Sequence, residues 1–263
     1  MALRRALVAQ GHEVALHDSG TFRFAADAPE AELICISGGD GTARVVLDRQ
    51  EDLSALPPLA IYPTGTINLL ARELGYPRDP VAFARRISGA GNRCVSQVAR
   101  AGAQTLVTCA SAGPDAFVVE TVSLALKERI GRLAYALALL RLMGRWPRKT
   151  MRLVADDQEF DAEAVFVLRG RHYAGPWSLH RGAGLEQERF HVLALPRARR
   201  RDIAGLIFYA LTGARRLRPH WRLLQCRRLQ VTASEPVPVQ VDGDVVASLP
   251  LLFEMTGQAI TWK

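Results

Sequence analysis

Few cysteines and no long apolar run limit the kinds of protein that this 263-residue chain can form. Its four cysteines, Cys35, Cys94, Cys109 and Cys226, lie far apart and show no CxxC spacing, which favours reduced, buried thiols over disulfides or a metal site. No segment reaches the roughly 20 apolar residues that span a bilayer, and the first residues lack the apolar stretch of a signal peptide. The sequence therefore predicts a cytoplasmic protein, and it leaves attachment to a membrane surface open.

Acidic residues are scarce relative to basic ones. The chain has 34 Lys and Arg against 26 Asp and Glu, and between Arg197 and Arg228 ten arginines face a single acid, Asp202. Such an excess favours an anionic partner: nucleic acid, nucleotide phosphates or an anionic membrane. No zinc-finger spacing, RNP-like string or helix-turn-helix signature accompanies the arginines, so we expect no binding of nucleic acid.

The length suits two domains, and the pattern of the chain changes near residue 93. Up to that point, helical stretches alternate with short apolar runs, as in an α/β layer with parallel strands buried on both faces. The expected helices are Met1–Gln10, Asn68–Leu74 with Asn68 as N-cap, and Pro80–Ser88 opened by Asp79. The expected strands are Glu13–His17, Leu33–Ser37 and Leu59–Tyr62.

From residue 94 to 263, β-like runs follow one another with few helices between them. Strands connected in this way are typically antiparallel, so we expect a β-rich second domain whose last residues could return to the first. The expected strands are Cys94–Arg100, Thr105–Ala110, Met151–Ala155, Ala162–Arg169, Phe190–Leu195, Leu229–Thr232 and Val237–Val241. Two helices are expected as insertions, over Thr121–Met143 and Asp202–Thr212.

The segment Gly38-Gly39-Asp40-Gly41-Thr42 follows an expected strand and precedes a helical run. Backbone N–H groups in such a turn can point at an anion, because no Cβ blocks the approach and the helix N-terminus adds partial positive charge. The alternative is an ordinary tight turn. The chain has no GxxxxGK[ST] and no GxGxxG, so the common phosphate-binding motifs do not apply.

A second glycine turn, Thr64-Gly65-Thr66, repeats the order of strand, turn and helix. In a parallel sheet two such strand ends face one crevice, where α/β proteins place their ligands, so the two loops could clamp one nucleotide. The alternative is that Pro63 and Gly65 only turn the chain while Asn68 caps the next helix.

Further motifs accompany the two turns: Pro63 to Asn68, "SAGPDAFVVE" at 111–120, "YAG" at 173–175 and "VPVQVDGDVV" at 237–246. Together with the turns, they resemble the diacylglycerol kinase catalytic domain family, which is shared with sphingosine kinases and bacterial lipid kinases. The resemblance implies an α/β nucleotide-binding domain of the NAD kinase and diacylglycerol kinase type over 1–93. A β-sandwich domain over 94–263 would follow, with the active site between the two. It implies an ATP-dependent kinase that phosphorylates the hydroxyl of diacylglycerol or a related lipid alcohol, with Mg²⁺. It leaves a homodimer open.

The resemblance also assigns roles to particular residues. It implies nucleotide contacts from Gly38, Gly39, Asp40, Gly41, Thr42, Ala43, Arg44, Gly65, Thr66 and Asn68. Asp244 matches the family's proton acceptor, although Asp-Gly flanked by valines is also a hairpin signal. Asp40 is the candidate catalytic carboxylate for Mg²⁺, directly or through water, because hard cations prefer carboxylate oxygens.

The chain departs from the family pattern at several places. Family members usually begin with a strand that ends in an Asn-Pro turn, whereas here a helix comes first; we expect either a sheet with a bare edge or a start codon chosen too late. Arg44-Val45 replaces an Asn-Glu pair, Leu69 replaces an Asp, and Gln187 replaces an Asp where some members bind a structural Mg²⁺. One alternative is therefore a catalytically impaired nucleotide- or lipid-binding member of the family. Another is an NAD kinase, although the second glycine turn and the late Asp-Gly-Asp argue against it.

Two apolar helices bear on the membrane. Ile203, Leu206, Ile207, Ala210 and Leu211 share one helical face between arginine clusters. This pattern indicates either docking on an anionic leaflet or a face packed on the core. The run at 133–146 could line a pocket for lipid tails or simply be buried.

Overall fold

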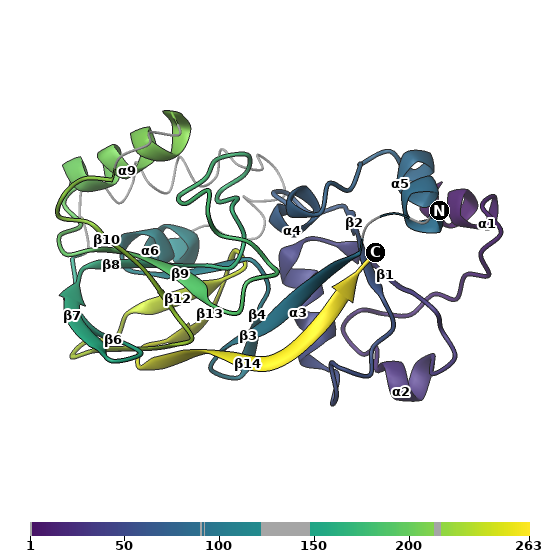
Figure 1. Cartoon of the computed structure of the whole chain (residues 1–263), viewed down its shortest axis with the longest axis horizontal. Coiled ribbons are helices and arrows are strands. Elements are labelled where there is room, and N and C mark those ends of the chain that lie inside the picture. Colours follow the sequence, from purple (N-terminus) through teal and green to yellow (C-terminus); the bar gives the residue numbers. More distant parts are fainter. Residues whose placement is uncertain (1, 90, 92, 122–147, 213–216) are drawn as a thin grey trace.

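The computed structural model describes residues 2–89, 91, 93–121, 148–212 and 217–263 (Figure 1). Within them the chain forms an N-terminal α/β domain followed by a C-terminal β-sandwich-like domain. The first domain contains α1 Ala2–Val8, α2 Phe24–Asp27, β1 Ile34–Gly38, α3 Asp40–Asp48, β2 Leu59–Pro63, α4 Leu69–Glu73 and α5 Pro80–Ser88.

The sandwich is built from antiparallel strands with two described helices. Its elements are β3 Cys94–Ala101, β4 Gln104–Leu106, β5 Cys109–Ala112, α6 Pro114–Thr121, β6 Met151–Ala155, β7 Gln158–Ala162, β8 Ala164–Leu168, β9 Phe190–Leu195, α9 Arg200–Thr212, β10 Arg222–Cys226, β11 Arg228–Ala233, β12 Pro238–Val241, β13 Asp244–Ser248 and β14 Leu251–Trp262. No helix within the described ranges is both long and apolar enough to cross a bilayer.

Two sheets carry this arrangement. The eight-stranded sheet has the order β1-β2-β14-β11-β6-β7, with β3 on β14 and β4 on β3; the six-stranded sheet has the order β10-β9-β8-β5-β12-β13. β1 and β2 pair in parallel, and β14 runs from the sandwich into the α/β domain, where Trp262 pairs with Leu59 of β2 (Figure 1). The larger sheet is therefore shared by both domains.

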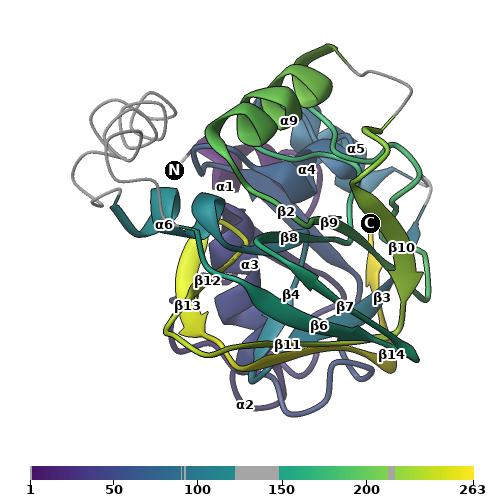
Figure 2. The same ribbon diagram turned by 90° about the vertical axis from the view of Figure 1, so that its left-hand side faces the viewer.

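Apolar residues form three clusters around these sheets. One fills the α/β domain, a second lies between the sheets of the sandwich, and a third lies between the outer face of the six-stranded sheet and α9. Figure 2 shows these layers, with α9 above β8 and β9 and with β6 and β11 below. In α9, Ile203 and Leu206 face the third cluster, so part of this helix packs on the core.

Several predicted elements are confirmed. The strands Met151–Ala155 and Phe190–Leu195 and the helix Pro80–Ser88 have the predicted bounds, and the Asp79 carboxylate caps that helix by accepting from the Ala82 N–H at 2.7 Å. The Asp-Gly hairpin also forms, because Asp242 and Gly243 have the positive φ values, 52° and 89°, that the tight turn between β12 and β13 requires.

Two predicted strands are wrong, and a third is confirmed with shorter bounds. Glu13–His17 is irregular, since Leu16 is 73% exposed and β1 pairs only with β2 among the described strands. Thr105–Ala110 divides into β4 and β5. Ala162–Arg169 is confirmed as β8 Ala164–Leu168, and the chain divides just before it, since Ala162 is the end of β7. At both divisions the chain crosses from one sheet to the other, which an apolar run in the sequence does not reveal.

Other elements had no sequence prediction, among them α2, α6, β10, β13 and β14. The predicted helix over Thr121–Met143 and the apolar run at 133–146 lie outside the described residues, apart from Thr121 at the end of α6.

Candidate functional site

The two glycine turns meet backbone to backbone. The Thr64 N–H donates to the Gly38 carbonyl at 3.1 Å, and a Cβ built on Gly65 would lie 2.7 Å from the Gly39 Cα. A side chain at Gly65 would therefore force the turns apart, and one at Gly39 would be tight, with its Cβ 3.3 Å from the Gly65 Cα. Glycine is required here because two chain segments touch, a reason that differs from the backbone freedom of an isolated turn.

Asp40 holds the second turn to the first. Its carboxylate accepts hydrogen bonds from the N–H groups of Leu69 and Leu70, both at 2.8 Å, and so caps α4. Asn68 occupies the N-cap position, as predicted, with a left-handed φ of 55°, but its side chain makes no capping hydrogen bond, and its amide donates to the Gly65 carbonyl instead. The prediction that Asn68 caps α4 is therefore corrected: the cap is Asp40.

The turns leave one buried acceptor at their junction. The Asn68 Oδ1 atom is buried and finds no hydrogen-bond partner in the described part of the chain. Close by, α3 begins at Asp40, and the first N–H groups of a helix have no acceptor within it. Backbone donors, a Cβ-free cradle and an acceptor in one place fit a polar, anionic ligand such as a nucleotide.

Asp244 lies over the first turn of α3. A Cβ on Gly41 would lie 2.6 Å from the Asp244 Oδ2 atom, and Arg44 donates to the same oxygen at 3.0 Å. Arg44 is buried and also donates to Gln104, whereas the Asp244 side chain is 40% exposed. The predicted phosphate contact Arg44 thus lies beneath Asp244 and holds its carboxylate in place. Ala43 is fully buried, and its N–H donates to the Gly39 carbonyl.

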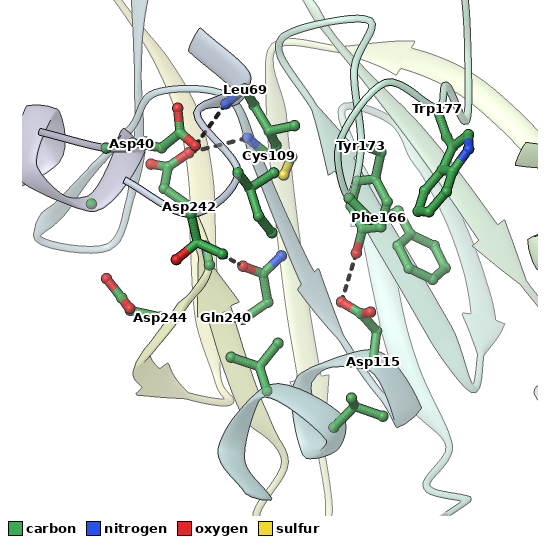
Figure 3. Close-up of a pocket in the computed structure, with 18 of the residues that line it drawn as sticks. Asp40, Leu69, Cys109, Asp115, Phe166, Tyr173, Trp177, Gln240, Asp242 and Asp244 are labelled. Carbon is green, nitrogen blue, oxygen red and sulfur yellow. Dashed lines mark hydrogen bonds between the residues drawn. The ribbon is translucent and has the colours of Figure 1, made fainter. Parts of the chain in front are cut away.

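A cavity of about 1030 Å³ joins these residues to the sandwich. Of the predicted contacts, the described part of its lining includes Gly39, Asp40, Gly41, Thr42, Gly65, Thr66, Asn68 and Asp244. Gly38, Ala43 and Arg44 lie behind it. The remaining wall is largely apolar and comes from α6, β8, the loop at 173–179 and α9. One end of the cavity is therefore polar and the other apolar (Figure 3).

Asp242 was not assigned a role from the sequence, yet it is buried beside Asp40 (Figure 3). Its carboxylate accepts from the N–H groups of Val107, Thr108 and Cys109 and from the Thr108 hydroxyl. These bonds explain why the predicted strand over Thr105–Ala110 breaks, since its N–H groups bond Asp242 instead of a neighbouring strand. Burial and the nearby Asp40 raise the pKa of Asp242 to about 7, although the hydrogen bonds oppose the shift.

Replacing Asp242 by asparagine should flatten the dependence of the free energy of unfolding on pH. The Asp242 carboxyl has a pKa of about 7 in the folded chain against an ordinary value of 3.8, so the folded state holds the proton more tightly. The stability that Asp242 contributes is fully present below pH 3.8 and is lost as pH rises through about 7. At about 1.36 kcal/mol per pKa unit, the loss amounts to about 4 kcal/mol at most.

Chemical denaturation between about pH 5 and pH 8 measures this slope. The exposed Asp157→Asn variant, in the turn between β6 and β7, is the matched control and should keep the slope of the natural chain. Equal slopes in Asp242→Asn and the natural chain would contradict the prediction.

The side chain of Arg169 reaches the turn at Leu185 to Glu188, which the resemblance matched to a structural Mg²⁺ site. This buried guanidinium donates to the carbonyls of Gln97, Leu185 and Gln187, at 2.6–2.8 Å. The Leu185 and Gln187 carbonyls of this turn thus already bind a cation that belongs to the chain. The described residues contain no group of three or more His, Cys, Asp or Glu side chains that could hold a metal ion.

Both domains of the chain match families of known proteins. The family model "Diacylglycerol kinase catalytic domain" matches residues 3–108, and the model "YegS C-terminal NAD kinase beta sandwich-like domain" matches residues 108–262. The two meet where the chain crosses from β4 to β5. A "Diacylglycerol kinase" of Bacillus subtilis is 26% identical over 223 residues, which cover 84% of this chain and 74% of that protein.

Two further proteins extend the comparison. A "Probable lipid kinase YegS-like" protein of Stenotrophomonas maltophilia is 27% identical over 261 residues, which cover 92% of this chain and 82% of that protein. A crystal structure of a diacylglycerol kinase from Bacillus anthracis has a TM-score of 0.72 at 20% identity, covering 99% of this chain and 89% of that one. At this identity the structural likeness shows the fold alone.

Proposed function

The chain belongs to the diacylglycerol kinase family of lipid kinases, and we propose that it transfers the terminal phosphate of ATP to the hydroxyl of diacylglycerol or a related lipid alcohol. The observation that supports this most directly is the single cavity whose polar end is formed by the two glycine turns and Asp244 and whose other end is apolar. A nucleotide needs the first kind of surface and lipid tails need the second.

The polar end would hold the nucleotide through its backbone. The turn at Gly39 to Gly41 and the turn at Gly65 and Thr66 present N–H groups without an obstructing side chain, and Asn68 Oδ1 offers a buried acceptor. Mg²⁺ bound with ATP neutralises phosphate charge and keeps several water ligands, so it needs few protein ligands. Asp40 would contact it through water, because both of its carboxylate oxygens already accept hydrogen bonds from the start of α4.

Asp244 would accept the proton of the lipid hydroxyl. General base catalysis needs a carboxylate within reach of the attacking hydroxyl and held in one orientation. The ion pair with Arg44 holds Asp244 at the mouth between α3 and the cavity. A conformationally fixed carboxylate next to the phosphate-binding turn is what phosphoryl transfer requires of the protein.

Incubation of the purified chain with labelled ATP, Mg²⁺ and lipid vesicles, followed by lipid extraction and mass spectrometry, tests the proposal. We expect label in a phosphorylated lipid. Nucleotide binding should be measured on the same preparation, because ATP binding without any labelled lipid would indicate a catalytically impaired member. Labelled NADP formed from added NAD would indicate the NAD kinase alternative.

The exposed side of α9 is the proposed membrane contact. Phe208 and Leu211 are 66% and 53% exposed, and Arg197, Arg200 and Arg201 are exposed near the start of the helix. Apolar side chains beside cations suit the boundary between headgroups and acyl chains of an anionic leaflet. The inner side of α9 lines the cavity, so a lipid could pass from the leaflet along this helix.

Replacing Phe208 by serine should weaken binding to vesicles that contain phosphatidylglycerol by roughly tenfold, because burying a phenylalanine side chain contributes about 1.5–3 kcal/mol. Sedimentation with the vesicles measures the affinity. Phe208 does not line the cavity, so transfer to a short-chain, water-soluble lipid alcohol should persist. Leu16→Ser, which changes an equally exposed apolar residue in the α/β domain, is the control, and an equal loss in both variants would refute a specific role for α9.

A further inference from the structure

The apolar part of the cavity contains one polar cluster, formed by Ser111, Asp115 and Tyr173. The Tyr173 hydroxyl donates to the Asp115 Oδ2 atom at 2.6 Å (Figure 3), and the Ser111 hydroxyl donates to the same atom, also at 2.6 Å. Asp115 and Tyr173 line the cavity among side chains such as Val118, Phe166 and Leu206. The cluster is separate from the glycine turns and from Asp244, and the roles assigned above do not use it.

Asp115 lacks a counter-charge within the described residues. None of the ion pairs found there includes it, and its Oδ1 atom receives no hydrogen bond from a described residue. Burial raises the pKa of the Asp115 carboxyl, while the bonds from Ser111 and Tyr173 lower it. Burying a carboxyl group in apolar surroundings costs free energy unless each oxygen accepts a hydrogen bond. The Oδ1 atom of Asp115 therefore needs a hydrogen-bond donor from a bound ligand.

The surrounding chain holds the cluster in a fixed position. Asp115 lies in the first turn of α6, and Tyr173 packs edge-on against Phe166 with ring centroids 5.6 Å apart. Left-handed backbone at Ala174 and Gly175 reverses the chain, so that the Tyr173 N–H donates to the Trp177 carbonyl. The "YAG" motif therefore forms the turn that presents Tyr173.

The neighbouring residue ties this loop to the nucleotide side. The buried Glu73 carboxylate, at the end of α4, accepts from the backbone N–H of His172 at 2.6 Å and lies 2.8 Å from its ring Nδ1. Since Asp40 caps the other end of α4, one short helix links the phosphate-binding turn to the loop that carries Tyr173. Hydrogen bonds thus connect the turn at Asp40, through α4 and the loop of Tyr173, to Asp115.

We propose that Asp115 selects the acceptor lipid by accepting a hydrogen bond, through Oδ1, from a second donor on that lipid. This rests on the proposed function and narrows its substrate class to lipid alcohols with a hydroxyl or amine besides the hydroxyl that is phosphorylated. A monoacylglycerol has such a second hydroxyl, whereas diacylglycerol offers only ester carbonyls beside its single hydroxyl. Tyr173 and Ser111 are positioning residues that orient the carboxylate.

Binding measured without ATP tests the proposal independently of catalysis. Phosphatidylcholine vesicles carrying equal mole fractions of monooleoylglycerol, dioleoylglycerol or a long-chain 2-amino alcohol are titrated with the natural chain, and affinity over lipid-free vesicles is compared. We expect the monoacylglycerol and the amino alcohol to bind more tightly than the diacylglycerol. The ratio of the affinities for the monoacylglycerol and the amino alcohol then shows whether Asp115 binds a hydroxyl or an amine more tightly.

Asp115→Asn is the decisive variant. The asparagine carbonyl can keep the bonds from Ser111 and Tyr173, while its amide N–H groups replace an acceptor by donors that suit an ester carbonyl. The preference for monoacylglycerol over diacylglycerol should fall by at least about tenfold, the factor that corresponds to about 1.4 kcal/mol. Tyr173→Phe, which keeps the ring but removes one positioning bond, should lower the preference less.

The outcomes separate the two proposals. Equal binding of the lipids by the natural chain, or a preference unchanged in Asp115→Asn, would overturn the inference even if phosphate transfer is observed. A preference that depends on Asp115 without transfer to any lipid would support the inference and refute the kinase function. Asp157→Asn serves as the matched control, and thermal unfolding of each variant shows whether the fold is kept.

Discussion

The Asp244→Asn variant is expected to transfer phosphate to lipid roughly 10²–10⁴ times more slowly than the natural chain, the range usually found when a general base is removed. Asparagine has nearly the same shape as aspartate but cannot take a proton from the attacking hydroxyl. It also removes the charge that pairs with the buried Arg44 guanidinium. Nucleotide affinity should change far less, because the glycine turns do not depend on this carboxylate. Initial rates with labelled ATP, together with a separate titration of nucleotide, measure the two effects.

Two further variants serve as controls for Asp244→Asn. Asp161→Asn removes an exposed carboxylate on β7, in the outer part of the sandwich, and should leave the rate unchanged. Asp244→Glu keeps a carboxylate and should retain a measurable rate, although the longer side chain must fit above Gly41. If Asp244→Asn transferred phosphate as fast as the natural chain, the proton would have another acceptor and the assignment would fail.

Gly65→Ala should weaken nucleotide binding by more than about tenfold, a change of about 1.4 kcal/mol. The added Cβ would lie 2.7 Å from the Gly39 Cα and 2.8 Å from Asn68 Oδ1, so one methyl group separates the two turns and disturbs their buried acceptor. The Gly39 atoms belong to the backbone, so they cannot move aside without shifting the chain. Overpacking of this kind also lowers the free energy of unfolding by about 1–3 kcal/mol. Calorimetric titration with an ATP analogue and denaturant unfolding measure the two losses.

The matched control for Gly65→Ala is Gly91→Ala. A Cβ on Gly91 would find its nearest neighbour at 3.9 Å, so the same chemical change meets no obstacle there. Nucleotide affinity should be unchanged in this variant. Equal affinities in Gly65→Ala and the natural chain would show that the two turns do not bind the nucleotide together.

The parts of the fold that follow from local chemistry could be predicted from the sequence. The Asp79-Pro80 start of α5, the Asp242-Gly243 hairpin and the parallel pair β1 and β2 each depend on residues that are close in the chain or on a buried apolar run. The crossings between sheets could not be predicted. At Glu163 the apolar pattern continues through the crossing, because residues on both sides of it are buried in different sheets.

In the candidate site, too, the sequence predicts local motifs but not contacts between distant residues. Glycines at 39, 41 and 65 pointed to a phosphate-binding crevice, and the order of the later motifs added Asp244. The cap of α4 by Asp40 and the burial of Asp242 depend on contacts across 29 and 133–135 positions in the chain, respectively, which a single sequence does not display. Asp115 lay within a recognised motif, but its hydrogen-bond partner Tyr173 is 58 positions away.

The long strand β14 links the order of synthesis to the order of folding. Ile260 and Trp262 are buried in the apolar cluster of the α/β domain, together with residues from α3, β1 and β2. These two residues follow the sandwich strands in the chain, so a ribosome makes them after the sandwich, and until then the core of the nascent α/β domain stays open. Folding of the first domain should therefore be completed only after β14 has been synthesised, and until then chaperones have access to the strand edge and apolar surface that β14 covers.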